Sequence, residues 1–138
     1  MPTTSAPRVL ILVGSESDRP RIEPAFAILD QAKEPYEFVI SSAHRNPDKT
    51  MQLAREAAGR GIKVIIAGAG LSAALPGAVA SATTLPVIGV PFAAGALHGV
   101  DALLAIAQLP SGVPVGTVGI DSAKNAAHLA LRILSIIP

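Results

Sequence analysis

The sequence contains no cysteine and no tryptophan, and its aromatic residues are limited to one tyrosine and three phenylalanines. The lack of cysteine excludes a disulfide framework, a thiolate nucleophile and a cysteine-based metal site. It is also compatible with a reducing cytosol. Because aromatic side chains are so few, the core must be built from Ala, Val, Ile and Leu, which let helices and strands approach one another closely.

An excess of charge of one sign is also missing, since 11 basic residues stand against 10 acidic ones and the formal net charge is +1. This balance leaves no basic face for nucleic acid or for an anionic membrane. Long hydrophobic runs are absent as well: residues 9–13 are too short for a signal or membrane helix, and residues 1–8 contain no such stretch. We therefore expect a cytoplasmic protein with no membrane and no nucleic-acid partner.

Small apolar residues are abundant: 50% of the 138 residues are hydrophobic, and the mean hydropathy is +0.50. The length suits one domain, so we assign residues 1–138 to a single domain. The apolar fraction is high for a free monomer of this size, because a small domain has little interior to hide it in. We expect part of the apolar surface to lie between the subunits of a homo-oligomer.

Hydrophobic periodicity predicts that strands alternate with helices along the chain. Short apolar runs predict strands at residues 9–13, 36–40, 63–67, 86–90 and 113–120. Helical patterns occur at residues 21–33, 47–59, 99–107 and 123–137. Short buried strands separated by helices favour a parallel sheet covered on both faces. The predicted fold is α/β, a flavodoxin-like three-layer sandwich with a central parallel sheet, in which ligands bind beyond the carboxyl ends of the strands.

Polar residues follow the first predicted strand in the segment Gly-Ser-Glu-Ser-Asp, residues 14–18. A glycine turn that leads into a helix exposes backbone N–H groups that can hold an anion. Ser15 and Asp18 are therefore candidate ligand-binding residues. The alternative is an ordinary helix cap, because Ser and Asp are favoured there for local reasons.

After the second predicted strand, residues 41–47 read Ser-Ser-Ala-His-Arg-Asn-Pro. An arginine such as Arg45 can bind phosphate in bidentate fashion, and a histidine such as His44 can carry a proton near neutral pH. Ser42 adds a hydroxyl to the same loop. A solvated polar loop is the alternative, but a His-Arg pair at the carboxyl end of a strand favours a ligand site.

The third such segment, residues 67–77, reads Ala-Gly-Ala-Gly-Leu-Ser-Ala-Ala-Leu-Pro-Gly. Its small residues allow the backbone to approach a planar ligand, which makes Gly70, Leu71 and Ser72 candidate binding residues. The spacing is not that of a dinucleotide-binding fingerprint. Tight packing of a helix on a strand explains Gly and Ala equally well.

Together these segments resemble the aminoimidazole ribonucleotide carboxylase and mutase family over about the whole chain, residues 9–134. The similar segments are residues 14–18, 42–47, 67–70, 75–77, 86–91, 99–104 and 108–115. Several separate motifs in the right order make a chance similarity improbable.

The resemblance implies a mutase that converts 5-(carboxyamino)imidazole ribonucleotide to 4-carboxy-5-aminoimidazole ribonucleotide in purine biosynthesis, with no metal and no cofactor. It implies that Ser15, Asp18 and Arg45 hold the ribonucleotide and that His44 is the catalytic proton carrier. CO2 released from the carbamate would stay in a closed pocket until C4 of the aminoimidazole attacks it. The resemblance also implies a homo-octamer with active sites at subunit contacts.

Two features depart from the family pattern. Ala74 stands where the mutases usually have a histidine, which bears on the rate or direction of the reaction. The chain ends at Pro138 without the extended carboxyl-terminal helix of many relatives, which leaves open whether the octamer is weaker or differently built.

Three functions stay open on the sequence alone. The mutase is favoured over a carboxylase or decarboxylase that uses free CO2, because the segment around Ala74 lacks the Arg-Ser-Asn-type sequence associated with direct carboxylases. A non-catalytic nucleotide-binding module is the third, since fold alone does not fix function.

His98 either lines the pocket or lies on a surface loop, and we favour the surface. His128 is interpreted as structural or interfacial.

Overall fold

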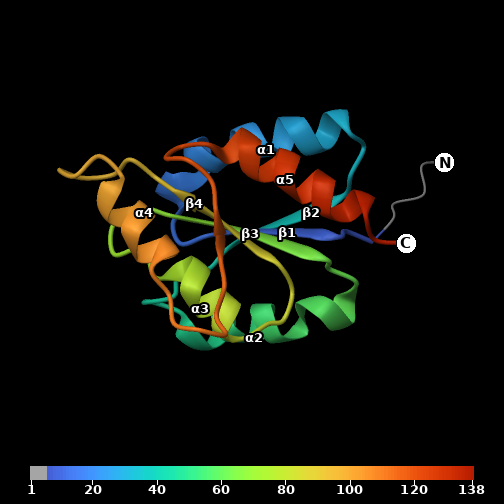
Figure 1. Cartoon of the computed structure of the whole chain (residues 1–138), viewed down its shortest axis with the longest axis horizontal. Coiled ribbons are helices and arrows are strands. Elements are labelled where there is room, and N and C mark those ends of the chain that lie inside the picture. The colour runs from blue at the N-terminus through green and yellow to red at the C-terminus, as the bar shows by residue number, and fades with distance from the viewer. Residues whose placement is uncertain (1–5) are drawn as a thin grey trace.

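The computed structural model describes residues 6–138, and Figure 1 shows one sheet enclosed between helices. The five strands are all parallel and lie in the order β2-β1-β3-β4-β5. Their bounds are β1 Val9–Val13, β2 Tyr36–Ile40, β3 Val64–Ala69, β4 Val87–Pro91 and β5 Gly116–Thr117. Residues 1–5, part of the amino-terminal segment interpreted above, lie outside the described residues.

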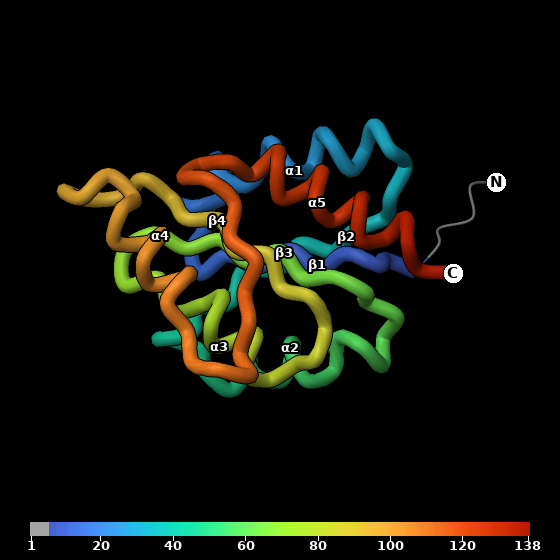
Figure 2. The backbone as a smooth tube through the Cα atoms, viewed as in Figure 1, coloured from blue at the N-terminus to red at the C-terminus, as the bar shows by residue number. Residues whose placement is uncertain are grey.

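Helices cover both faces of the sheet, as the ribbon and the tube show (Figures 1 and 2). On one face α1 (Arg19–Gln31) lies beside α5 (Ala123–Ser135). The other face is covered by α2 (Pro47–Ala57), α3 (Leu75–Ser81) and α4 (Val100–Ala107), while short 3-10 turns, η1 (Glu16–Asp18) and η2 (Ala58–Arg60), precede α1 and follow α2. The predicted flavodoxin-like three-layer sandwich is confirmed.

Two apolar cores, one on each face of the sheet, hold these layers together. Alternate residues of β1 serve different cores: Val9, Ile11 and Val13 pack with α1 and α5, whereas Leu10 and Leu12 pack with the opposite helices. All five residues of β1 are fully buried, as a central parallel strand between two helical layers requires. The continuous apolar run that predicted β1 therefore reflects burial on both faces.

The structure differs from the prediction mainly at one helix and one strand. Helix α3 was not predicted, because its Ala-, Gly- and Pro-rich sequence resembles a loop; Pro76 is tolerated because it lies in the first turn, where its missing N–H costs nothing. The strand predicted at residues 113–120 pairs with β4 only at Gly116 and Thr117. It is an edge segment that contains Pro114 and Gly119, and both residue types weaken strand pairing.

The strand order locates the part of the sheet at which a ligand can bind. The chain passes from β1 to β2 on one side and then crosses to β3 on the other, so the connections reverse direction between β1 and β3. The loops that follow these two strands diverge to opposite faces and leave a crevice at the carboxyl end of the sheet. The segments after β1, β2 and β3 therefore meet at this edge.

Within residues 6–138, no helix has the length and apolar character needed to cross a membrane.

Gly68 offers a direct test of the tight packing beneath this edge. A Cβ atom at Gly68 would overlap the ring of Phe92, which is fully buried, so the ring or the strand would have to shift. We predict that Gly68→Ala lowers the free energy of unfolding by about 1–3 kcal/mol. The measurement is urea denaturation at a fixed protein concentration.

Gly59→Ala is the matched control, because a Cβ atom there meets nothing within 4 Å. This change is expected to raise stability by about 0.4–1 kcal/mol through the unfolded chain. Equal midpoints for the two variants would show that Phe92 does not restrict the space at Gly68.

Candidate active site

A pocket of about 450 Å³ lies at the carboxyl edge of the sheet, where the connections reverse. Its walls come from the segments that follow β1, β2, β3 and β4. The lining residues are Gly14, Ser15, Ser17, Asp18, Ser42, Ala43, His44, Arg45, Ala69, Gly70, Leu71, Ser72, Ala74, Leu75 and Ala94. All eight residues singled out from the sequence are among them, so the fold brings three distant segments to one site.

The first wall is the turn between β1 and α1. Ser15 caps the short turn η1, and its hydroxyl accepts a hydrogen bond from the backbone N–H of Ser17 at 3.3 Å. The hydroxyls of Ser15 and Ser17 lie 2.9 Å apart. The cap predicted as the alternative interpretation is thus present, and it holds two hydroxyls side by side at the pocket mouth. Ser17 is a lining residue that the sequence analysis did not select.

Asp18 ends this turn and precedes α1. Partial burial raises the pKa of the Asp18 carboxyl above its ordinary value, and the guanidinium of Arg21 partly offsets this by lowering that pKa. A carboxylate that is only partly solvated gains more than an exposed one from new hydrogen-bond donors. The Asp18 carboxylate is therefore suited to accept hydrogen bonds from ligand hydroxyl groups.

The second wall is a turn that Ser42 organises. Its hydroxyl accepts hydrogen bonds from the backbone N–H groups of His44 at 3.2 Å and Arg45 at 3.0 Å. Ser42 therefore supports the backbone of both His44 and Arg45. Beneath the turn, the buried hydroxyls of Ser41 and Thr50 lie 2.7 Å apart and tie the loop to α2.

The side chains of His44 and Arg45 project from this supported turn into the pocket mouth, where both are exposed. The His44 ring nitrogen Nε2 lies 3.1 Å from the backbone carbonyl oxygen of Ser72. The imidazole thus bridges the second wall and the third. Within residues 6–138, the Arg45 guanidinium makes no hydrogen bond, so its five N–H donors are available to a ligand.

The third wall follows β3 and approaches the segment after β4 closely. A Cβ atom at Gly70 would lie 2.9 Å from the Cβ of Ala94, and one at Gly95 would lie 2.6 Å from Leu71 Cδ2. Small residues at 70 and 95 are therefore required for this contact. Ala74 lies in the same wall, at the start of α3, and its side chain is exposed to the pocket. The departure from the family pattern thus falls within the site.

The fourth wall is fixed by a contact that the sequence does not reveal. Arg21 Nη1 donates to the carbonyl oxygen of Ala93 at 2.9 Å, and Asp121 Oδ1 accepts from the N–H of Ala93 at 3.0 Å. Asp121 is in a left-handed conformation with φ of 57°. Both backbone groups of Ala93, next to the pocket residue Ala94, are thereby held by α1 and by the segment before α5.

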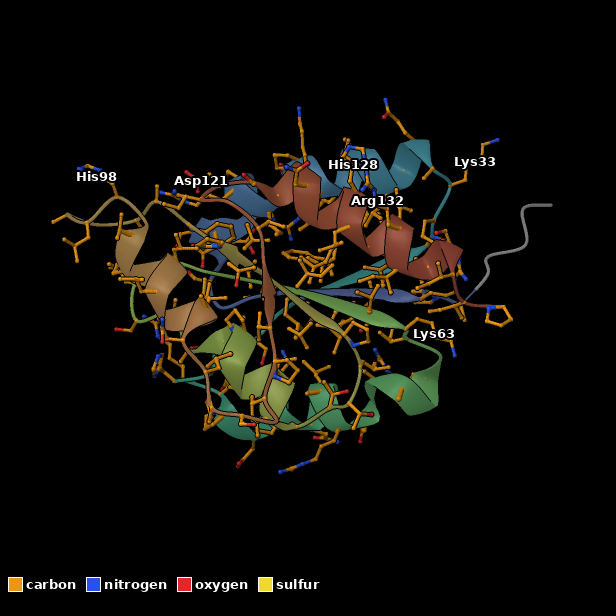
Figure 3. All side chains as sticks on the ribbon, viewed as in Figure 1. Lys33, Lys63, His98, Asp121, His128 and Arg132 are labelled. Carbon is orange, nitrogen blue, oxygen red and sulfur yellow. The ribbon has the colours of Figure 1, made fainter. Side chains whose placement is uncertain are left out.

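The other two histidines lie outside the pocket. Figure 3 shows His98 on the loop that leads into α4 and His128 on α5, both on the outside of the molecule. Both side chains are exposed, and neither lines the pocket. The surface interpretation of His98 is therefore confirmed for this chain, and His44 is the pocket's histidine. Across residues 6–138, no group of three or more His, Cys, Asp or Glu side chains could hold a metal ion.

The fold and the pocket together define a flavodoxin-like α/β protein with a ligand site at the switch point of a parallel sheet. The chain belongs to the AIR carboxylase family, whose model matches residues 8–137. It is 58% identical over 130 residues to the N5-carboxyaminoimidazole ribonucleotide mutase of Pyrococcus horikoshii, covering 94% of this chain and 73% of that protein.

Two further relatives extend the comparison. The phosphoribosylaminoimidazole carboxylase of Schizosaccharomyces pombe is 55% identical over 130 residues, which cover 94% of this chain and 24% of that longer protein. The solved structure of Treponema denticola PurE superposes with a TM-score of 0.85 at 32% sequence identity, covering 96% of this chain and 82% of that one. Relatives of both names, mutase and carboxylase, therefore share this domain.

Asp18 gives a pH-dependent test of the site. Its pKa is higher in the folded protein than in the unfolded chain, so the stability it contributes is fully present below its ordinary pKa and is lost as the pH rises through the folded value. At neutral pH the partly buried carboxylate opposes folding. We predict that Asp18→Asn raises the urea midpoint at pH 7 but changes it little at pH 3.

The exposed carboxylate of Glu23 on the same helix supplies the control, through Glu23→Gln. All variants are compared at one protein concentration, since association would shift the midpoints. If the gain for Asp18→Asn were the same at pH 3 and pH 7, its cause would not be the desolvated carboxylate.

Proposed function

We propose that this chain is an isomerase of purine biosynthesis that converts 5-(carboxyamino)imidazole ribonucleotide to 4-carboxy-5-aminoimidazole ribonucleotide. The observation that carries the proposal is the meeting of His44, Arg45, Ser15 and Asp18 in one pocket. Membership of the AIR carboxylase family and 55–58% identity to proteins named as mutases support the same reaction.

The pocket's chemistry suits a ribonucleotide. The backbone N–H groups and hydroxyls of the Ser15 turn, together with the Arg45 guanidinium, can bind the phosphate. The Asp18 carboxylate only accepts hydrogen bonds when ionised, so it suits the ribose hydroxyls rather than the phosphate. The closely packed backbone at Gly70, Leu71 and Ser72 leaves a surface against which a planar imidazole ring can lie.

The isomerisation requires one proton to be added and one to be removed, with no net change. A proton goes to the carbamate nitrogen, the bond from that nitrogen to the carboxyl carbon breaks, and CO2 is released within the pocket. C4 of the electron-rich imidazole then forms a bond to CO2, and the proton on C4 leaves. A single group that first gives and then takes a proton satisfies this balance, and His44 is positioned to be that group.

We predict that His44→Asn lowers kcat by about 10²–10⁴-fold because it removes the proton carrier, while the ribonucleotide still binds. The assay follows the interconversion of the two carboxylated isomers, and calorimetry measures binding. His128→Asn is the matched control, since it removes an exposed histidine on α5 far from the pocket.

Two other outcomes would change the proposed function or the proposed mechanism. If the wild-type protein binds the ribonucleotide tightly without turnover, it is a non-catalytic binding module. If turnover is unchanged in His44→Asn, the pocket works without this histidine and the proposed mechanism is wrong. A carboxylase that uses free CO2 is the alternative reaction, favoured by the name of the Schizosaccharomyces pombe relative.

We further propose a cytoplasmic homo-oligomer, with the octamer as the expected size. Exposed large apolar side chains on the pocket wall, on α4 and on the loop before α4 support an interface: Leu71 is 66% exposed, Leu97 63% and Leu104 54%. Such a group of exposed residues is typical of a protein contact surface. The mass of the purified protein in sedimentation equilibrium would contradict this proposal if it were that of one chain.

A further inference from the structure

The backbone of Ser72 has a conformation that serine seldom adopts. Its φ of 46° lies in the left-handed region, which residues other than glycine seldom adopt. Backbone conformations of this kind cluster at functional sites. Its carbonyl oxygen accepts a hydrogen bond from the backbone N–H of Ala74 at 2.7 Å. The buried residues Gly70 and Ala73 fix the chain around it. The carbonyl is therefore held in one direction before any ligand arrives.

This same carbonyl oxygen lies 3.1 Å from His44 Nε2. A carbonyl can only accept a hydrogen bond, so Nε2 must carry the proton in this contact. In a neutral imidazole the other ring nitrogen, Nδ1, then has a free lone pair. The backbone of His44 is fixed as well, through the Ser42 hydroxyl. Both ends of the His44 side chain are thus restrained by groups outside the ring.

We propose that the Ser72 carbonyl is a positioning group that keeps Nε2 of His44 protonated, so that Nδ1 is the atom that gives and takes the catalytic proton. The reactive role of Nδ1 rests on the proposed function. The tautomer itself depends only on the hydrogen bond, and the two can be tested separately.

The proposal assigns each proton of the reaction to an atom. The doubly protonated ring gives its Nδ1 proton to the carbamate nitrogen as the bond to the carboxyl carbon breaks. The ring is then neutral with Nε2–H still bound to Ser72. When C4 has bonded to CO2, the C4 proton moves to Nδ1 and restores the starting state. Ser72 acts through His44 and takes no proton itself.

Nitrogen NMR of the wild-type protein provides the direct test. We would record solid-state ¹⁵N spectra of sedimented protein carrying ¹⁵N-labelled histidine, at a pH where the spectra show neutral rings. His44→Asn identifies the His44 signals by their disappearance. We expect His44 to show a single tautomer with Nε2 protonated, and the exposed His98 and His128 to show mixed tautomers. A protonated Nδ1 at His44, or a mixture equal to that of the other two rings, overturns the proposal.

A pair of substitutions at position 72 tests the cause. Ser72→Gly keeps the left-handed conformation available, whereas Ser72→Val disfavours it because a β-branched side chain strains positive φ. We expect His44 to remain a single tautomer in Ser72→Gly and to become mixed in Ser72→Val. Relative to Ser72→Gly, Ser72→Val should lower kcat by about 10- to 100-fold with a small change in KM, since a misplaced proton carrier slows the chemical step.

Failure of this inference and failure of the proposed function give different results. If the tautomer is as expected but the wild-type protein has no isomerase activity, the proposed function is wrong and the Ser72 contact stands. If the enzyme is active but His44 is not held as the Nε2–H tautomer, the positioning role is wrong and the function stands. A Ser72→Val variant with a mixed tautomer and unchanged kcat would also overturn the role of Nδ1.

Discussion

The parallel pairing of β1 with both β2 and β3 is the constraint on which the site depends. Val13, the last residue of β1, pairs with Ile40 at the end of β2 and with Gly68 near the end of β3. The three strands therefore end almost level, and the loops that follow them begin side by side. In an antiparallel sheet the same loops would lie at opposite edges. Ser15, His44 and Ser72 meet because of this register.

Few side chains of the pocket can exchange a proton. Its function therefore depends on how accurately those side chains are positioned. His44 is the pocket's histidine, and the carbonyl oxygen of Ser72 lies within hydrogen-bond distance of its ring. The adjoining wall after β4 is held by Arg21 and Asp121 through both backbone groups of Ala93. Positioning of this kind can account for a large part of catalysis when the substrate is already activated.

Local patterns in the sequence predicted the fold well where burial dominates. The bounds of β1 and β2 are those predicted: β1 is a fully buried apolar run, and β2 is a half-buried run at the edge of the sheet. Helix α3 was missed because its stability comes from packing of Leu75 and Val79 against the sheet rather than from the helix propensity of its residues. The edge strand β5 was predicted too long, because period and composition do not show how far a partner strand extends.

The sequence predicted which loops and residues line the pocket, but not the contacts between them. The position of each polar residue just after a strand placed Ser15, His44 and Arg45 at one edge. Contacts between distant segments were not predictable, because no local signal links Arg21 with Ala93 or His44 with Ser72. The positive φ of Ser72 also has no sequence signature, since serine is not among the residue types that adopt this conformation readily.

The most direct test of the central claim is to follow the carboxyl carbon during the reaction. The purified protein would convert the carboxyamino ribonucleotide in the presence of ¹³C-bicarbonate, and mass spectrometry would measure the label in the 4-carboxy product. The account predicts a product without label, because CO2 passes from nitrogen to C4 inside the pocket without reaching solvent. Label in the product at the level of the external bicarbonate would contradict it and identify a carboxylase that uses free CO2.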